Sequence, residues 1–317
     1  MNTLPFNIAH VGVPPIKCQG IKTKLVGFIF RSIKWDGLVG GRWIEPFLGS
    51  GVVALNLAPE RAWLADTNRH IIGFYQAIQS GEMTPSNVRE FLTGEGRKLQ
   101  TDGADYYYEV RRRFNEKGSP FDFLFLNRSC FNGVVRFNQH GQFNVPFGHK
   151  PQRFTKAYIT KIVNQVGWAA RQMEGKEWEF RVAGWNEILP EALPGDFVYL
   201  DPPYIGRHTD YYNAWNEAEA RQLSLAAQQL PCGFALSMWL ENRFRKNDHI
   251  ARHWGDLEMR VCSHFYHVGS SENLRNEMDE ALLIKPGFAT TDMGKYKTKR
   301  EPKKDLQLSL SWDGVLS

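Results

Sequence analysis

The chain has 317 residues, of which 42% are hydrophobic, 13% aromatic and 23% charged. This composition excludes an intrinsically disordered protein, because so much apolar surface can be buried that folding offsets the entropy of ordering. The formal net charge of +5 and the pI near 8.9 are only mildly basic, so charge alone does not identify nucleic acid as a partner.

Cysteine spacing and the amino-terminal sequence predict the cellular setting. The four cysteines lie far apart and form no C-x-x-C pair, which argues against a zinc cluster or a disulfide framework. The first residues lack the charged head and apolar run of a signal peptide, and the chain has no apolar stretch of about 18 residues. We therefore expect a soluble cytoplasmic protein with reduced thiols and no membrane contact.

Short apolar segments alternate with helix-compatible segments along the chain. Residues 42–47, 51–58 and 61–66 are typical of a strand, a helix and a second strand. Further strands are predicted over residues 179–184, 196–203, 233–239 and 280–286, with a helix over 216–230. The pattern predicts an α/β fold with a Rossmann-like, doubly wound sheet.

The interval between the strand that ends at Asp66 and the strand that ends at Leu200 is far longer than a βαβ crossover needs. It contains a predicted helix over residues 106–117 and a basic segment described below. We therefore predict an inserted, mainly helical domain over residues 69–158. The discontinuous main domain is predicted over residues 1–68 and 159–290, and residues 291–317 form a basic, flexible tail.

The segment from Phe123 to Met173 contains no Asp or Glu but seven Lys and Arg residues. Such a segment suits a surface that faces phosphate groups. Within it, residues 131–148 are rich in Phe and Val on both sides of the turn 138–141, which predicts a β-hairpin. An ordinary edge hairpin kept soluble by basic side chains would show the same pattern.

The tail segment 295–304 has six basic residues and one acidic residue. Charge runs of this kind are usually solvated and disordered. We expect the tail to add nonspecific attraction to phosphate at most.

A glycine-containing motif, Glu45 to Gly51, stands between the first predicted strand and the first predicted helix. Glycines at this point let the backbone pass close beneath a nucleotide-like ligand, and Asp66 at the end of the next strand is placed to accept ribose hydroxyls. Gly49, Gly51 and Ala54 also fit the G-x-G-x-x-A pattern. A dinucleotide-dependent oxidoreductase and a simple strand-to-helix turn therefore remain alternatives.

The most informative motif is Asp201-Pro202-Pro203-Tyr204, which directly follows an apolar strand. The lone pair of an exocyclic adenine amine is delocalised into the ring, so methylation requires aligned acceptors for the amine protons. Asp201 and the Pro202 carbonyl fit that role in a turn stiffened by two prolines, and Tyr204 would stack on an extruded base. The other interpretation is a plain strand-end turn.

These motifs resemble those of the Dam-like, D12 class (alpha group) DNA adenine-N6 methyltransferases. That family has an N-terminal lysine motif, an F-x-G-x-G loop, a target-recognition insert and then D-P-P-Y. The resemblance covers residues 14–286 and is carried by segments 14–25, 106–115, 123–133, 143–147, 201–208 and 264–269. It implies direct methyl transfer from S-adenosylmethionine to a flipped adenine in duplex DNA, releasing S-adenosylhomocysteine, within a restriction-modification system.

The resemblance also implies a cofactor site. It places S-adenosylmethionine against Cys18, Lys22, Glu45, Phe47, Gly49, Gly51, Asp66 and Asp201. Lys22 makes independent sense as a cation near the methionine carboxylate. Cys18 stands where the family usually has a tryptophan, so only its backbone is expected to line the pocket.

Implied DNA contacts lie mainly in the predicted hairpin. Arg136 corresponds to an arginine that reads guanine, and Phe131 to an aromatic wedge in the base stack; a phosphate contact is the alternative for Arg136. Lys150 stands where enzymes that recognise GATC have an aromatic reader, so we expect a specificity that differs from plain GATC. The resemblance implies GATATC as the target, with a GATC-containing site as the second choice. The other implied DNA-binding residues are Lys17, Arg128, Asn132, Val134, Pro146, Ser270, Asn273 and Arg275.

Two further classes of function remain open. A methyltransferase acting on cytosine N4, RNA or protein glutamine would share the glycine loop, but such enzymes more often begin the turn with Ser or Asn than with Asp. A noncatalytic DNA-binding protein would retain the fold without the chemistry. We expect a monomer that acts on double-stranded DNA, with a restriction endonuclease as a further partner. No metal is expected, because a sulfonium donor needs no Lewis acid and no ligand cluster is visible in the sequence.

Overall fold

The computed structural model describes residues 8, 10–35, 37, 40–203, 215–242, 245–246, 248–265 and 277–291. Tyr204, Ser270, Asn273 and Arg275, together with the basic tail segment 295–304, lie outside the described residues. Within the described part of the chain, no helix is both long and apolar enough to cross a membrane.

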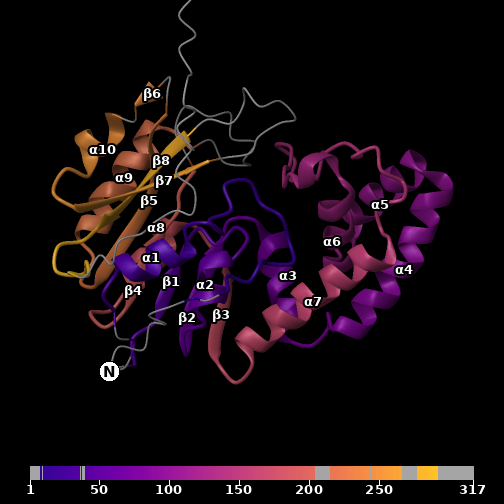
Figure 1. Cartoon of the computed structure of the whole chain (residues 1–317), viewed down its shortest axis with the longest axis horizontal. Coiled ribbons are helices and arrows are strands. Elements are labelled where there is room, and N and C mark those ends of the chain that lie inside the picture. Colours follow the sequence, from indigo (N-terminus) through magenta and orange to yellow (C-terminus); the bar gives the residue numbers. More distant parts are fainter. Residues whose placement is uncertain are drawn as a thin grey trace, which may run out of the picture.

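Eight strands of the described residues form one mixed sheet. They are β1 (Trp43–Glu45), β2 (Arg61–Asp66), β3 (Glu177–Val182), β4 (Phe197–Leu200), β5 (Gly233–Asn242), β6 (Arg245–Lys246), β7 (Glu258–Phe265) and β8 (Glu277–Ile284). The strand order is β3-β2-β1-β4-β5-β8-β7, with β6 paired to β5 (Figure 1). Strands β3, β2, β1, β4 and β5 run parallel to one another, whereas β8 is antiparallel to both β5 and β7.

Helices connect and cover these strands. They are α1 (Val26–Ser32), α2 (Val52–Leu57), α3 (Arg69–Gln79), α4 (Pro85–Asp102), α5 (Ala104–Lys117), α6 (Pro120–Ser129), α7 (Lys156–Met173), α8 (Trp185–Ile188), α9 (Glu217–Gln228) and α10 (Asp248–His253). Two short 3-10 helices, η1 (Phe131–Gly133) and η2 (Leu189–Glu191), complete the described elements. The mixed sheet covered by helices confirms the α/β class predicted from the sequence.

Both faces of the sheet are buried, in two separate hydrophobic clusters. Along β4, Phe197 and Tyr199 enter the cluster shared with α1, α2 and α3, while Val198 and Leu200 enter the cluster shared with α8, α9 and α10. A strand buried on both faces is apolar at every position, and all four β4 residues are buried. This explains why the continuous apolar runs of the sequence predicted the central strands.

The helices α4, α5, α6 and α7 lie to one side of the sheet, between β2 and β3 in the chain (Figure 1). Helix α4 packs against α7, and α5 packs against α6. Helix α3, at the start of the predicted insert, contacts both β3 and α6, so it joins the helical region to the sheet. The predicted helix over 106–117 is confirmed as the larger part of α5.

The predicted hairpin, residues 131–148, is paired more loosely than expected. The turn is present, because Gly141 N donates to Asn138 O at 2.9 Å, but only isolated antiparallel bridges join the two arms. Side chains of helix α5 take up the backbone hydrogen bonds of the second arm. The Asn115 side chain donates to Phe143 O and accepts from Phe143 N, and the Tyr107 hydroxyl donates to Val145 O at 2.8 Å. The second arm therefore packs on the helical region instead of forming a regular ladder.

Candidate active site

A cavity of about 950 Å³ opens at the carboxyl ends of the parallel strands. Ligands of open α/β sheets bind at this edge, where loops from neighbouring strands converge. The predicted site residues that line the cavity are Cys18, Lys22, Glu45, Phe47, Gly49, Asp66, Asp201, Pro202 and Pro203. One cavity thus brings together three sequence motifs that are distant in the chain.

The glycine loop between β1 and α2 depends on left-handed backbone conformations. Gly49 has a φ of 50° and Gly51 a φ of 65°, values that L side chains rarely adopt. Gly51 N donates to Leu48 O at 2.8 Å and the residue caps α2. Gly51 is not among the cavity-lining residues, so it shapes the loop, whereas Gly49 faces the cavity.

Asp66, at the end of β2, fixes the same loop from the neighbouring strand. Its Oδ2 accepts the Gly49 amide at 2.9 Å, and its Oδ1 accepts the Asn68 amide at 2.8 Å. Burial raises the pKa of this carboxyl, and the two amide hydrogen bonds oppose the shift. The side chain therefore orients the loop; the predicted contact with ribose hydroxyls stays a prediction.

An ion pair between a buried lysine and an aspartate that is 24% exposed joins the N-terminal segment to the turn after β4. The Lys22 ammonium lies 2.8 Å from Asp201 Oδ1 and also donates to Gly20 O at 3.1 Å. The Lys22 side chain is only 3% exposed. Burial raises the pKa of Asp201, while the charge and hydrogen bond of Lys22 lower it. Lys22 thus favours the ionised form of Asp201, a contact that the sequence did not predict.

Glu45 is a second carboxyl beside Asp201. It is 2% exposed, and its Oε1 accepts the Trp43 indole N–H at 2.7 Å. Burial raises the pKa of Glu45 to about 8; the Trp43 hydrogen bond opposes this shift, and the negative charge of Asp201 adds to it. Glu45 is therefore mostly protonated at neutral pH in this structure.

Several cavity-lining residues were not singled out from the sequence. Trp185 and Asn186 follow β3, and Trp215 precedes α9. Trp215 packs edge-to-face on Phe47, with ring centroids 5.7 Å apart. Because ligands bind beyond the carboxyl ends of strands, the segment after β3 that contains Trp185 and Asn186 could have been selected from the sequence.

The predicted hairpin borders the same cavity. Val135, Phe137 and His140 contribute to its lining. Arg136 lies between them in sequence; its Nε donates to Asn144 Oδ1 at 2.8 Å, so the opposite arm orients the guanidinium.

The other hairpin residues expected to contact DNA differ in exposure. Phe131 is 50% exposed although it is large and apolar. Val134 is half-buried, whereas Asn132, Pro146 and Lys150 are exposed.

Arg128 differs from the expected surface position. It is 4% exposed; its Nε donates to Pro15 O at 2.7 Å, and its Nη2 donates to Gln165 Oε1 at 2.5 Å. The guanidinium therefore holds the N-terminal segment against α7 and is not presented to a ligand. Burial lowers its pKa, as it does for the neighbouring Lys17.

Lys17 is half-buried. Its backbone N–H donates to Asn127 Oδ1 and its carbonyl accepts from Asn127 Nδ2, each at 2.8 Å. These contacts fix the path of the N-terminal segment. The predicted contact between its ammonium and DNA stays a prediction.

Comparison of this chain with known proteins finds matches to adenine-specific DNA methyltransferases. The family described as D12 class N6 adenine-specific DNA methyltransferase matches residues 19–268. The DNA adenine methylase of Serratia marcescens is 31% identical over 249 residues, which cover 75% of this chain and 85% of that protein. The DNA adenine methylases of Salmonella typhi and Escherichia coli (strain K12) are each 28% identical over 267 residues, covering 78% of this chain and 87% of each relative.

The family match spans Lys22, the glycine loop, the helical region with its hairpin segment and the Asp201 turn. Of these, Lys22, the loop, the hairpin segment and the turn meet around the cavity. The chain therefore belongs to the D12 class of N6 adenine-specific DNA methyltransferases.

Proposed function

We propose that this protein transfers a methyl group from S-adenosylmethionine to the N6 atom of an adenine flipped out of a specific duplex site. The observation that carries the proposal is the position of Asp201. Its carboxylate stands at the end of β4 and in the lining of the 950 Å³ cavity, paired with Lys22 at 2.8 Å and close to the glycine loop.

The cavity suits a cationic cofactor of this size. Its volume lies within the range of cofactor sites, and four carboxyl groups, those of Glu45, Asp66, Asp201 and Glu219, contribute to its lining. Phe47 and Trp215 supply aromatic surface for an adenine ring. When bound, S-adenosylmethionine supplies a methyl carbon that carries its sulfonium leaving group.

The residues of the turn after β4 act on the adenine amine. Asp201 accepts one amine proton and the Pro202 carbonyl accepts the other, which directs the nitrogen lone pair towards the methyl carbon. Lys22 favours the ionised Asp201 needed for this role. As the N–C bond forms and the C–S bond breaks, the nitrogen must lose one proton, and Asp201 is a base within hydrogen-bonding reach. Tyr204 is proposed to stack on the flipped base.

The helical region is proposed to read the DNA. We assign residues 69–158 to target recognition, residues 1–68 and 159–290 to catalysis, and residues 291–317 to a basic tail. Arg136, oriented by Asn144, is proposed to bond guanine in the major groove, and the exposed Phe131 to fill the gap left by the adenine. The proposed target is GATATC, because the segments quoted above also resemble the modification methyltransferase of the EcoRV restriction system. A cognate restriction endonuclease is the proposed partner.

Replacing Asp201 with Ala tests the catalytic assignment. We expect methyl incorporation from labelled S-adenosylmethionine into a GATATC duplex to fall by at least about 100-fold, because an aligned acceptor is lost from the transition state. Asp256→Ala, which removes an exposed carboxylate in the turn before β7, serves as the matched control and should keep the wild-type rate. Duplexes containing GATC alone, or neither sequence, define the target; labelling of cytosine or of RNA would contradict the proposed substrate.

Replacing Arg136 with Ala tests the guanine contact. We expect the binding preference for GATATC over a duplex with the guanine replaced to shrink by about 1–3 kcal/mol, with nonspecific binding little changed. The exposed Arg171→Ala on α7 controls for general loss of positive charge. A uniform loss of affinity for all sequences would instead identify Arg136 as a phosphate contact.

The protonated Glu45 predicts that cofactor binding depends on pH. A bound cation favours the ionised carboxylate and so lowers the Glu45 pKa from about 8; binding at neutral pH should release a proton. Affinity should therefore increase as pH rises towards 8, by up to about tenfold per unit, and level off above it. Isothermal titration calorimetry of the wild type and Glu45→Gln checks this. An identical pH dependence of the two proteins would remove Glu45 from the cofactor site.

A further inference from the structure

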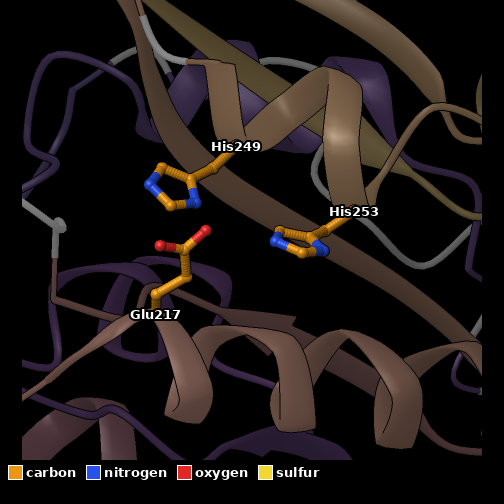
Figure 2. Close-up of side chains that lie close together, drawn as sticks. All are labelled: Glu217, His249 and His253. Carbon is orange, nitrogen blue, oxygen red and sulfur yellow. The ribbon is translucent and has the colours of Figure 1, made fainter.

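Three side chains of metal-binding type meet on the face of the sheet that carries α9 and α10. Glu217 is the first residue of α9, while His249 and His253 lie one turn apart on α10 (Figure 2). The carboxylate points from α9 towards the two rings on the facing helix (Figure 2). One ligand atom from each residue lies within 4.8 Å of the ligand atoms of the other two.

We propose that Glu217, His249 and His253 bind a zinc ion. Two histidines four residues apart on a helix present their rings on one side, and two histidines with one glutamate form an established zinc ligand set. A tetrahedral site with ligand distances of about 2 Å needs donor atoms about 3.3 Å apart. The ligand atoms must therefore close in from 4.8 Å by up to about 1.5 Å, a movement that rotation of the exposed Glu217 side chain and of the two histidine rings can provide.

The space beside the histidines is suitable for one small ligand. A cavity of about 20 Å³ is lined by both histidines together with Trp215, Pro202 and Pro203, among others, while Glu217 approaches the histidines from outside this lining. This volume holds about one water-sized species. His253 Nε2 is buried and, among the residues that the structure describes, has no hydrogen-bond partner. A buried ring nitrogen without a partner is costly, and a coordinated ion would satisfy it.

Neighbouring groups hold the ligands in place. Arg252 Nη1 lies 2.7 Å from Glu217 Oε1 and orients the carboxylate, as partners outside the coordination shell commonly do. The carbonyl of His253 accepts hydrogen bonds from Ser224 Oγ at 2.7 Å and from Gln228 Nε2 at 3.1 Å, so the end of α10 is already fixed on α9. The positive charge of Arg252 opposes a cation, which makes the intervening carboxylate essential for binding.

A zinc ion here would act as a brace. It would link α9 to α10 and lie next to Pro202 and Pro203 of the turn after β4. Methyl transfer from a sulfonium requires no Lewis acid, so the predicted effect is on stability. The sequence did not reveal this group because its ligands come from two separate helices and only the histidine pair is local.

The test uses the full-length, tag-free protein after removal of metal with a chelator. Titration with zinc chloride in a calorimeter should show one bound ion per chain, and zinc should raise the melting temperature. Cobalt(II) at the same site should give visible d–d absorption. Loss of a residue outside the coordination shell weakens metal binding by up to about 100-fold, so loss of the ligand in His253→Gln should weaken zinc binding by more than that. Glu217→Gln should abolish the zinc-dependent rise in melting temperature.

Control variants distinguish zinc binding at this site from zinc binding by histidines elsewhere in the chain. His10→Gln removes an exposed histidine far from α10 in sequence and should bind zinc like the wild type. Because Glu217 is exposed, Glu217→Gln should fold normally without metal, which keeps the test valid if His253→Gln does not. The proposal is overturned if the wild type shows no saturable zinc binding, or if both ligand variants retain wild-type affinity and stoichiometry.

Discussion

The candidate site depends on the ion pair between the buried Lys22 and the partly exposed Asp201. Removing the lysine charge from water is costly, and the cost is recovered only when the ammonium keeps its partner and further hydrogen bonds. Here the ammonium also bonds the Gly20 carbonyl, and the pair lies where the N-terminal segment crosses the end of β4. The same contact therefore fixes the chain path and favours the ionised form of Asp201 in the turn after β4.

The N-terminal segment links the helical region to the sheet. At one end, Pro15 and Lys17 are held by Arg128 and Asn127 on α6. At the other end, Lys22 is held by Asp201. The segment therefore gives the helical region a physical connection to the turn after β4, through hydrogen bonds to α6 at one end and the ion pair at the other.

The glycine loop is fixed in a similar way by a side chain from another strand. Asp66 bonds the amides of Gly49 and Asn68, so β2 determines the shape of the loop that follows β1. The cavity is consequently preorganised by contacts among its own walls. Glu45, protonated within it, adds an acidic group that a bound cation can ionise.

The sequence predicted the parts of the fold that have a local signal. The central strands were predictable because strands buried on both faces are apolar throughout, and Asp201 because its turn follows such a strand. Strand β7, at the sheet edge, was not predicted because it lacks the continuous apolar run by which the central strands were recognised; Met259 and Val261 are exposed there. The buried position of Arg128 and the Lys22–Asp201 contact depend on tertiary packing, which a single sequence does not encode locally.

The most direct test of this account is a double-mutant cycle on the free energy of unfolding, using Lys22→Met, Asp201→Asn and the double variant. Each single change should lower that free energy by about 3 kcal/mol, because it leaves a buried charge or polar group without its partner. The double variant should be more stable than the sum of the single losses predicts, with a coupling of about 1–3 kcal/mol. Additive losses, within about 0.5 kcal/mol, would contradict the central role of this ion pair.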